Sequence, residues 1–453
     1  MFDIDILETT GLGNRSYLAS DGQVAIAIDP PRDIDRVLAL AGSRGVRIAL
    51  VLSTHSHNDM ISGETELARL TGAQLASPAD DGAQYRRDAV TDGDVLTAGR
   101  MHLRVLHTPG HTHHHVAYAL QASDGDTQAV FTGGSLLFGA TGRTDLVGPE
   151  HTDTLTRAQF HSVRRLVAEL PADTAVYPTH GFGSFCAATP TSGEDSTLGE
   201  QQQVNPALTL DEQTYVDTLL AGLDAYPAYY KQMSPVNRRG PAPVDLTAPE
   251  PVDGDEVRRR IDAGAWVVDL RDRTAFAAGH IAGTLGFELS TSFVTYLGWT
   301  IPWGTPLTLI GESAEQVADA QRELVRIGID RLAGAATGPV EQLTDSPLSS
   351  YDVIDFGGLR DAQQRGSVRV LDTRRHDERR DAAIPGSQHI PLHELADRLD
   401  ELPDTTLFIH CGSGYRASIA ASMLDALGKQ VVLVDDSFDN ARTAGLIDSS
   451  VAA

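Results

Sequence analysis

The chain has 453 residues, 62 of them acidic and 36 basic, which gives a formal net charge of −26 at pH 7. A surface this acidic repels phosphate backbones and anionic lipid headgroups, so we expect neither a nucleic-acid nor a membrane partner. The length predicts about three domains, each with its own core. Two cysteines, Cys186 and Cys411, rule out a disulfide framework, and no segment reads as a signal peptide or a membrane span. A cytoplasmic protein is therefore expected.

Histidines follow three predicted strands of the first segment, residues 1–208. This segment alternates short β-rich runs, such as residues 47–54, with helical stretches such as residues 33–45, which is the pattern of an α/β domain. Directly after residues 47–54 the chain reads His-Ser-His-Asn-Asp, and later strands lead into His-Thr-Pro-Gly-His and Pro-Thr-His-Gly. Imidazoles placed at strand ends with these spacings are typical of a metal site.

These motifs resemble the metallo-β-lactamase fold, whose hallmark is a THxHxDH turn followed by single ligands on later loops. The resemblance covers residues 1–208 and implies an αββα sandwich. The sequences GRTDL from Gly142 and HGFGSFC from His180, together with residues 218–241, further resemble the branch of that superfamily that is fused to rhodaneses. That branch contains persulfide dioxygenases and related sulfur enzymes.

The resemblance implies one iron ion held by two histidines and one aspartate. By motif the histidines are His55 and His111, and the carboxylate belongs at the position of Gly134, which has no side chain to offer. A two-histidine, one-carboxylate set favours non-haem Fe(II), because the carboxylate balances charge and the open positions admit oxygen. Loss of the carboxylate removes a hard oxygen ligand and a unit of negative charge, so other ligands must compensate.

A second departure is Met60, which stands where a two-metal hydrolase of this fold has histidine. Together with Gly134 it removes one ligand of the second metal and the bridging carboxylate, which counts against two-metal hydrolysis. The remaining candidates are the first-position histidines and a remnant of the second position, namely His55, His57 and His111, with Asp59 and His180. We expect one metal ion, Fe(II) or Zn(II), with a weakly filled site or an empty pocket as the alternatives.

Several neighbouring residues have a plainer interpretation. The three histidines at 113–115 are interpreted as a solvated turn, from which at most one or two side chains could face the site as a substitute ligand. Cys186 has no basic neighbour in sequence and is interpreted as a small buried apolar residue. Arg143 and Asp145 are predicted to form either a pair that holds the adjacent loop or a surface ion pair.

The rest of the chain predicts a linker and a duplicated domain. Residues 209–250 read as a helical piece and then, from Ser234, as a Pro- and Arg-rich linker. Residues 251–345 and 352–447 contain two versions of one layout, about a hundred residues apart. In the first copy Gly311 or Glu312 occupies the place of the second copy's cysteine, so that copy cannot hold a persulfide. Its expected role is packing, docking or shaping a cleft.

The second copy aims Cys411 into a ring of backbone amides. An apolar run over 406–409 predicts a buried strand and a helix is predicted from Ala417, so the cysteine lies on a strand-to-helix turn. The free amides and the positive end of the helix dipole form an anion cradle that should stabilise a thiolate, with Arg416 adding positive potential. The loop residues between them are Gly412, Ser413, Gly414 and Tyr415. This loop is one residue shorter than that of cysteine phosphatases and fits sulfur rather than phosphate.

Residues 352–447 resemble a rhodanese domain, and the first copy resembles the inactive half of tandem rhodaneses. The predicted fold class is therefore α/β, an αββα sandwich followed by two rhodanese-like domains with central parallel sheets. The predicted activity is sulfur transfer through a Cys411 persulfide, with thiosulfate, a glutathione-type or other low-molecular-weight persulfide, and sulfite as the small partners. Family likeness also implies persulfide oxidation by the first domain and a homo-oligomer. The alternatives are a glyoxalase-II-like zinc hydrolase, or a metal-free scaffold attached to a rhodanese.

Overall fold

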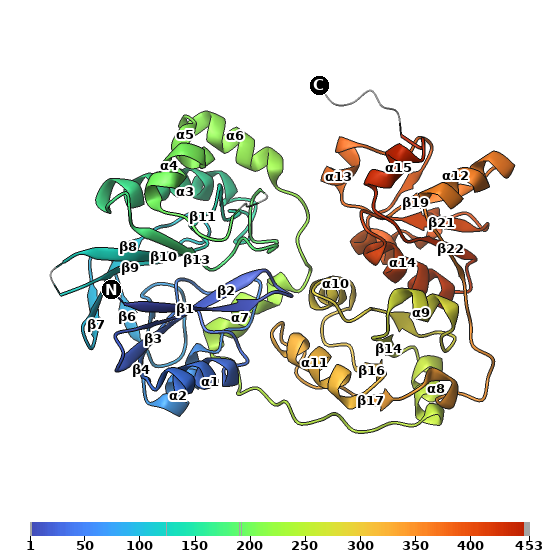
Figure 1. The fold of residues 1–453 in the computed structure, drawn as a ribbon, viewed down its shortest axis with the longest axis horizontal. Coiled ribbons are helices and arrows are strands. Elements are labelled where there is room, and N and C mark those ends of the chain that lie inside the picture. The colour runs from blue at the N-terminus through green and yellow to red at the C-terminus, as the bar shows by residue number, and fades with distance from the viewer. Residues whose placement is uncertain (1, 124, 190, 192, 448–453) are drawn as a thin grey trace. The chain divides into compact units, whose positions relative to one another are not determined.

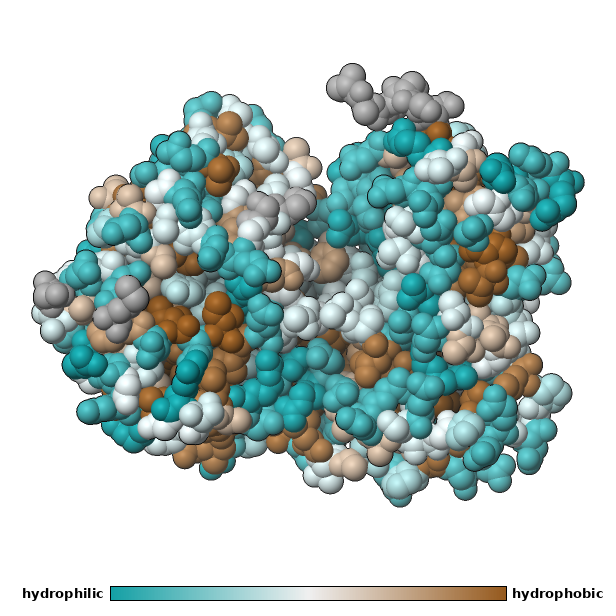
Figure 2. Space-filling view, in the orientation of Figure 1, coloured by the Kyte–Doolittle hydropathy of each residue, from teal (hydrophilic) through white to brown (hydrophobic). Residues whose placement is uncertain are grey.

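The computed structural model describes residues 2–123, 125–189, 191 and 193–447. Its internal contacts divide the chain into two compact units, Met1–Val244 with Leu324–Gly328, and Asp245–Glu323 with Ile329–Ala453. No helix in the described ranges is both long and apolar enough to cross a bilayer. The face of the molecule in Figure 2 carries mostly hydrophilic side chains, as expected from the number of charged residues.

Two mixed sheets form the middle of the first unit (Figure 1). One sheet has the order β1-β2-β3-β4-β5-β6, and its strands are β1 (Asp3–Thr9), β2 (Asn14–Ser20), β3 (Val24–Ile28), β4 (Arg47–Leu52), β5 (Gln74–Pro78) and β6 (Asp88–Val90). The other has the order β13-β10-β9-β8-β7, and its strands are β7 (Val95–Ala98), β8 (Met101–His107), β9 (Val116–Gln121), β10 (Thr127–Gly133) and β13 (Ala175–Pro178). A short pair, β11 (Leu136–Leu137) and β12 (Ala140–Thr141), follows β10.

Helices cover the outer face of each sheet. They are α1 (Asp35–Arg44), α2 (Glu64–Thr71), α3 (Thr152–Glu169), α4 (Leu198–Val204), α5 (Pro206–Thr209) and α6 (Glu212–Gly222). A further helix, α7 (Tyr230–Arg239), packs against the loop after β4 instead. Figure 1 shows α1 and α2 on one side of the sheet pair and α3 to α6 on the other.

Alternation along the strands separates three layers of core. On β2, Tyr17 belongs to the cluster between the sheets, whereas its neighbour Leu18 belongs to the cluster under α1 and α2. On the second sheet, Phe131 faces the first sheet and Val130 packs with Phe160 of α3. Because side chains alternate along a strand, each sheet buries both faces. The predicted αββα sandwich is confirmed.

The second unit contains two parallel sheets. The first has the order β15-β14-β16-β17, with β14 (Trp266–Asp269), β15 (Leu285–Gly286), β16 (Leu307–Gly311) and β17 (Gly334–Thr337). The second has the order β18-β22-β21-β19-β20, with β18 (Asp352–Ile354), β19 (Arg369–Asp372), β20 (Gln388–His389), β21 (Leu407–His410) and β22 (Val431–Val434).

The helices that follow residue 250 connect these strands. They are α8 (Gly254–Asp262), α9 (Arg273–Ala278), α10 (Phe293–Thr300), α11 (Ala314–Val325), α12 (Phe356–Arg365), α13 (His376–Asp381), α14 (Tyr415–Ala426) and α15 (Asp439–Thr443), with short 3₁₀ turns at Val340–Gln342, Leu392–Asp397 and Leu399–Glu401. Parallel strands joined by helical crossovers are the predicted architecture, and the α/β fold class is confirmed.

The strand order β20-β19-β21-β22 of the second sheet repeats the order β15-β14-β16-β17 of the first, and β18 is an additional edge strand. The register is repeated as well. Asp269 pairs with Ile310 in the first sheet, and Asp372 pairs with His410 in the second. The residue that follows the paired position is therefore Gly311 in one copy, where it ends β16, and Cys411 in the other. Of the two residues considered, Gly311 rather than Glu312 therefore occupies the position of the cysteine.

The segment interpreted as a linker from Ser234 onward is helical through Arg239. Asn237 on this helix donates from Nδ2 to the carbonyls of His57 (2.9 Å) and Met60 (2.8 Å), and its Oδ1 accepts from the Ser62 amide. These long-range bonds outweigh the helix-breaking tendency of Pro235 inside α7. Within residues 234–250, the part that lacks regular structure is 240–250.

Candidate functional site

Five buried imidazoles gather at the ends of β4, β8 and β13 and at the start of β9 in the first unit. The ring centroid of His55 lies 4.2 Å from that of His57 and 4.9 Å from that of His111. The ring of His180 lies 5.3 Å from both His55 and His111, and His115 stacks on His55 at 4.8 Å. Each of these side chains is at most 1% exposed. The four predicted histidines therefore come together, although they are far apart in sequence.

Hydrogen bonds on the outer side of two rings fix which nitrogen faces inward. The Nδ1 atom of His111 lies 2.7 Å from the carbonyl oxygen of Arg143, and Nδ1 of His180 lies 3.0 Å from Oδ1 of Asn14. Both oxygens can only accept, so each Nδ1 carries the hydrogen and each Nε2 keeps a lone pair. The Nε2 atoms of His180 and His55 lie 3.4 Å apart, close enough to share one ion.

A buried carboxylate, Asp29, organises the other two rings. It accepts from the amide and hydroxyl of Thr54 (2.7 and 2.8 Å) and from the hydroxyl of Thr179 (2.5 Å). Since the Thr54 hydroxyl donates to Asp29, it accepts from Nδ1 of His55 at 2.9 Å, which leaves Nε2 of His55 as the free nitrogen. Asp29 also lies 3.2 Å from Nε2 of His57, although among the described residues neither nitrogen of this ring has a hydrogen-bond partner of good geometry.

The charges of this network follow from burial. Burial by itself lowers the pKa of His57, but the charge and hydrogen bond of Asp29 outweigh it and raise that pKa. Burial, followed by the neighbouring imidazoles, lowers the pKa of His55, and burial is the main cause that lowers the pKa of His111 to about 3. These two rings are therefore neutral at pH 7, as a metal ligand must be.

The cluster fits a divalent ion. In the described part of the chain, Nδ1 of His57, Nε2 of His111 and Oδ1 of Asp59 are buried without a hydrogen-bond partner. The ligand atoms of His55, His57 and His180 lie within 4.8 Å of one another. Buried polar atoms without partners are costly, and a bound cation would satisfy them. These residues would hold the metal that the fold implies.

Asp59 lies behind the cluster and supports His180. Its Oδ2 accepts from Nδ2 of Asn14 at 2.8 Å and lies 3.3 Å from Nδ1 of His180. Burial alone would raise the pKa of Asp59. The charge of His180 and the hydrogen bonds from His180 and Asn14 outweigh burial and lower that pKa, so the carboxylate is ionised. Neither close group of ligand atoms in the described residues includes Asp59. Its position suits orienting an imidazole and balancing charge.

The interpretation of residues 113–115 as a solvated turn is wrong for His115. This ring is fully buried, and its Nδ1 lies 2.8 Å from the hydroxyl of Thr108. Its Nε2 accepts from the amide of Gly134 at 3.0 Å. Both nitrogens are thus occupied, so His115 holds the backbone at Gly134 and supplies no free ligand atom.

Gly134 leaves no room for the aspartate that the family resemblance places there. A Cβ atom at this position would lie 2.3 Å from Cδ2 and 2.7 Å from Cγ of His111, and one at Gly142 would lie 2.7 Å from its Nδ1. The His111 ring therefore occupies a slot between two glycines. Any side chain at position 134 would therefore have to displace this ring.

Arg143 ties this slot to Cys186. Its guanidinium is 4% exposed and pairs with Asp145 through Nε at 2.7 Å and Nη2 at 2.8 Å, so it is an internal rather than a surface pair. The Arg143 amide donates to the carbonyl of Cys186 at 2.8 Å. The thiol of Cys186 is buried, as expected for an apolar residue, and burial is the main cause that raises its pKa.

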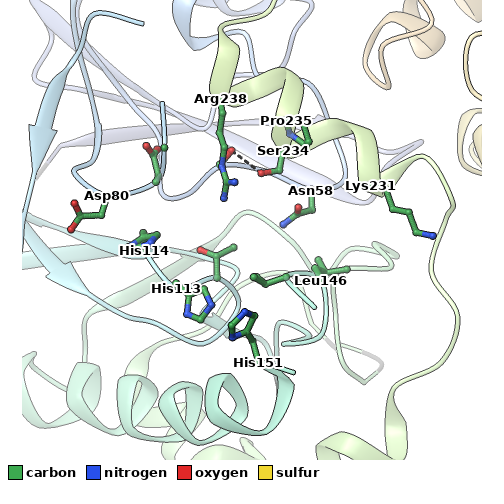
Figure 3. Close-up of a pocket in the computed structure, with 15 residues that line it drawn as sticks. Asn58, Asp80, His113, His114, Leu146, His151, Lys231, Ser234, Pro235 and Arg238 are labelled. Atoms are coloured by element: carbon green, nitrogen blue, oxygen red, sulfur yellow. Dashed lines mark hydrogen bonds between the residues drawn. The ribbon is translucent and has the colours of Figure 1, made fainter. Parts of the chain in front are cut away.

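An open cavity of about 440 Å³ lies beside the cluster (Figure 3). Ser56 and Asn58, which flank His57 in sequence, line it together with Thr112. Figure 3 shows Arg238 and Ser234 projecting from α7 on one side, with His113 and His151 on the opposite side. Lys231 also lines the cavity, as do Asp80 and Asp81, so the lining carries both cationic and anionic side chains.

Cys411 lies at the end of β21 in the second unit and is 1% exposed. In the described chain, the backbone amides from Gly412 to Ala417 donate to no other backbone carbonyl, and the first such bond is from Ser418 to Gly414 at 2.8 Å. Gly414 has φ +87°, and a Cβ there would lie 1.8 Å from Oδ1 of Asp435, so only glycine fits. These amides are free of backbone partners, as the predicted cradle requires, and the cradle itself stays a prediction.

The sequence did not reveal the partner of Arg416. Glu378 of α13 accepts from Nη1 and Nη2 of Arg416 at 2.5 and 2.7 Å. This bidentate pair offsets the positive charge that Arg416 was expected to lend to the thiolate, although it fixes the guanidinium against the loop. The cradle thus depends mainly on its amides and on the α14 dipole.

The silent copy contributes a wall to this site. Tyr296, Trp299 and Thr300 of α10 enclose a cavity of about 10 Å³ with Arg416 and Thr373 of the second copy. The hydroxyl of Tyr415 donates to the carbonyl of Glu288 at 2.8 Å. Among the roles expected for the silent copy, shaping a cleft agrees with this arrangement.

The tight fit of His111 against Gly134 gives a first prediction. We expect Gly134→Ala to lower the free energy of unfolding by about 1–3 kcal/mol, because the added methyl overlaps a buried ring. Gly42→Ala is the matched control, since Gly42 lies exposed on α1 with open space around it. Denaturant unfolding of both variants measures the difference. Equal stability of the Gly134→Ala and wild-type proteins would contradict the packing described for His111.

Comparisons with known proteins agree with this geometry. A family model of the metallo-beta-lactamase superfamily matches residues 10–180, and one of the rhodanese-like domain matches residues 357–444. The mitochondrial persulfide dioxygenase ETHE1 of Homo sapiens is 32% identical over 209 residues, which cover 44% of this chain and 74% of that protein. A hydroxyacylglutathione hydrolase-like protein of Mus musculus is 29% identical over 236 residues, covering 47% of this chain and 77% of that protein.

A solved structure extends the likeness beyond the first unit. The crystal structure of a metallo-beta-lactamase from Staphylococcus aureus has a TM-score of 0.66 and 26% identity, and covers 75% of this chain and 99% of that chain. The chain belongs to the metallo-β-lactamase superfamily, as a relative of the persulfide dioxygenases that carries a rhodanese-like domain at its carboxyl-terminal end.

Proposed function

We propose that this chain, an enzyme of sulfur metabolism, is a sulfurtransferase that carries sulfur as a persulfide on Cys411. The buried cysteine on a loop whose amides have no backbone acceptors supports it most strongly, because such amides can stabilise a monoanion of the size of a persulfide. The rhodanese-like match over residues 357–444 supports the same chemistry.

The transfer proceeds in two displacements. The Cys411 thiolate attacks the outer sulfur of thiosulfate, a sulfur–sulfur bond forms, and the bond to the sulfonate sulfur breaks with release of sulfite. The persulfide anion then rests among the amides of residues 412–416. An acceptor such as cyanide, a thiol or sulfite attacks the outer sulfur, and the cysteine leaves as thiolate. Arg416, held by Glu378, supports the loop during both steps.

Cys411→Ser is expected to reduce thiosulfate:cyanide sulfurtransfer by at least about 1,000-fold, because a hydroxyl cannot replace the thiolate nucleophile. Ser313→Ala, in the corresponding turn of the silent copy, is the control and should keep wild-type turnover. Thiocyanate formation measures the rate, and thermal unfolding shows whether each variant is folded. Sulfur transfer retained by Cys411→Ser would contradict the proposal.

We propose in addition that the first unit oxidises a persulfide to sulfite. Its likeness to the human persulfide dioxygenase and the inward-facing imidazoles support this activity. A bound iron ion would supply redox chemistry with oxygen, whereas zinc would supply only a Lewis acid. His55, His57 and His180 would hold the ion, and Lys231 and Arg238 at the cavity would attract the carboxylates of a glutathione-type persulfide.

The other candidate functions have less support. A two-metal hydrolase needs separate ligand sets, but His180 has one free nitrogen to divide between the two close groups, and Met60 is a buried apolar side chain. A metal-free scaffold would leave Nδ1 of His57 and Nε2 of His111 buried without partners. One ion in a persulfide-oxidising site meets both constraints.

Oxygen uptake tests the oxidation. With glutathione persulfide, the iron-loaded protein is expected to consume one oxygen molecule and one water per persulfide and to form glutathione and sulfite. The Cys411→Ser variant should accumulate sulfite, whereas wild type should convert part of it to thiosulfate by adding the Cys411 sulfur. An oxygen electrode and sulfur-anion chromatography measure both products. No oxygen uptake with iron supplied would remove this part of the proposal.

A further inference from the structure

The cluster contains a donor that the family resemblance does not provide. Sγ of Cys186, one ring nitrogen of His111 and one ring nitrogen of His180 all lie within 4.8 Å of one another. All three side chains are fully buried. In addition, Nε2 of His111 has no hydrogen-bond partner among the described residues. The thiol of Cys186, the unpartnered Nε2 of His111 and the ring of His180 therefore converge on one buried point.

The local backbone holds this thiol in place. The Cys186 amide donates to Oγ of Ser184 at 3.1 Å, and its carbonyl accepts from the amide of Arg143. The carbonyl of Arg143 in turn accepts from Nδ1 of His111. One residue thus positions both the thiol and the imidazole, so their separation is fixed by backbone geometry rather than by side-chain freedom.

The charge lost at Gly134 is the reason to assign the thiol a role. A carboxylate at that position would have given one anionic donor, and the His111 ring now fills its space. A Cys186 thiolate would return one donor and one negative charge to the same cluster. Thiolate and imidazole together favour softer divalent ions such as Zn²⁺ over the hard-ligand sites that magnesium or calcium need.

We propose that Cys186 is a metal ligand. Its thiolate is the anionic donor, and His111 and His180 are the neutral donors beside it. On binding, the sulfur–hydrogen bond breaks, the sulfur–metal bond forms, and the proton passes to solvent. The inference rests on the metal binding proposed above for this cluster. It departs from the two-histidine, one-carboxylate set by making sulfur the anionic donor.

Cobalt(II) provides a direct spectroscopic test. We expect full-length wild type loaded with one equivalent of Co²⁺ to show a near-ultraviolet thiolate-to-metal charge-transfer band. Cys411→Ser, which removes the only other cysteine in the chain, should keep this band. Cys186→Ser should lose it and bind cobalt at least about tenfold more weakly, as loss of a donor reduces affinity.

A second measurement does not depend on a Cys186 variant. X-ray absorption of zinc-loaded Cys411→Ser protein should show one sulfur at about 2.3 Å from the metal. A wild-type protein that binds one cobalt without the band, or a zinc shell of nitrogen and oxygen only, would overturn the assignment of Cys186 while leaving metal binding intact. Failure to bind either ion would instead overturn metal binding, and the Cys186 assignment with it.

Discussion

The first unit depends on one buried carboxylate, Asp29. Ionised groups are costly to bury unless they are paired, and Asp29 meets this cost by accepting from Thr54 after β4 and Thr179 after β13 while facing His57. These bonds join loops from both sheets. They also set the hydrogen on His55 through Thr54, so the free Nε2 of His55 follows from this interaction. Asp29 itself adopts φ 47°, the one positive value among the described residues other than glycine.

The two units present opposite solutions to handling sulfur anions. In the first, neutral imidazoles turn lone pairs toward a cation, and the cation would attract the substrate. In the second, the cysteine precedes a loop of amides without backbone acceptors and the start of α14, and the guanidinium of Arg416 is paired with Glu378. Both sites lie at the carboxyl ends of strands, where loops can bring groups together without disturbing the sheets. In the proposed functions, sulfite is a product of the first unit and an acceptor for the second.

Pattern and motif predicted the layers, the parallel sheets, the four histidines and the cysteine loop, because these depend on local spacing. The contributions of Asp29, His115, Asn237 and Glu378 could not be predicted, since each acts through a partner distant in sequence. An acidic residue at the end of the apolar run 24–28 was the one available signal for Asp29. The pairing that offsets the charge of Arg416 was missed for the same reason, because Glu378 lies 38 residues away.

The central claim is that this cluster holds a single ion. His180 belongs to both close groups of ligand atoms, but its Nδ1 is committed to Asn14, so one nitrogen must serve whichever ion is bound. The most direct test is the metal-to-protein ratio, determined by elemental analysis after loading with zinc and removal of free metal. The account predicts one ion per chain. Two tightly bound ions per chain would contradict it.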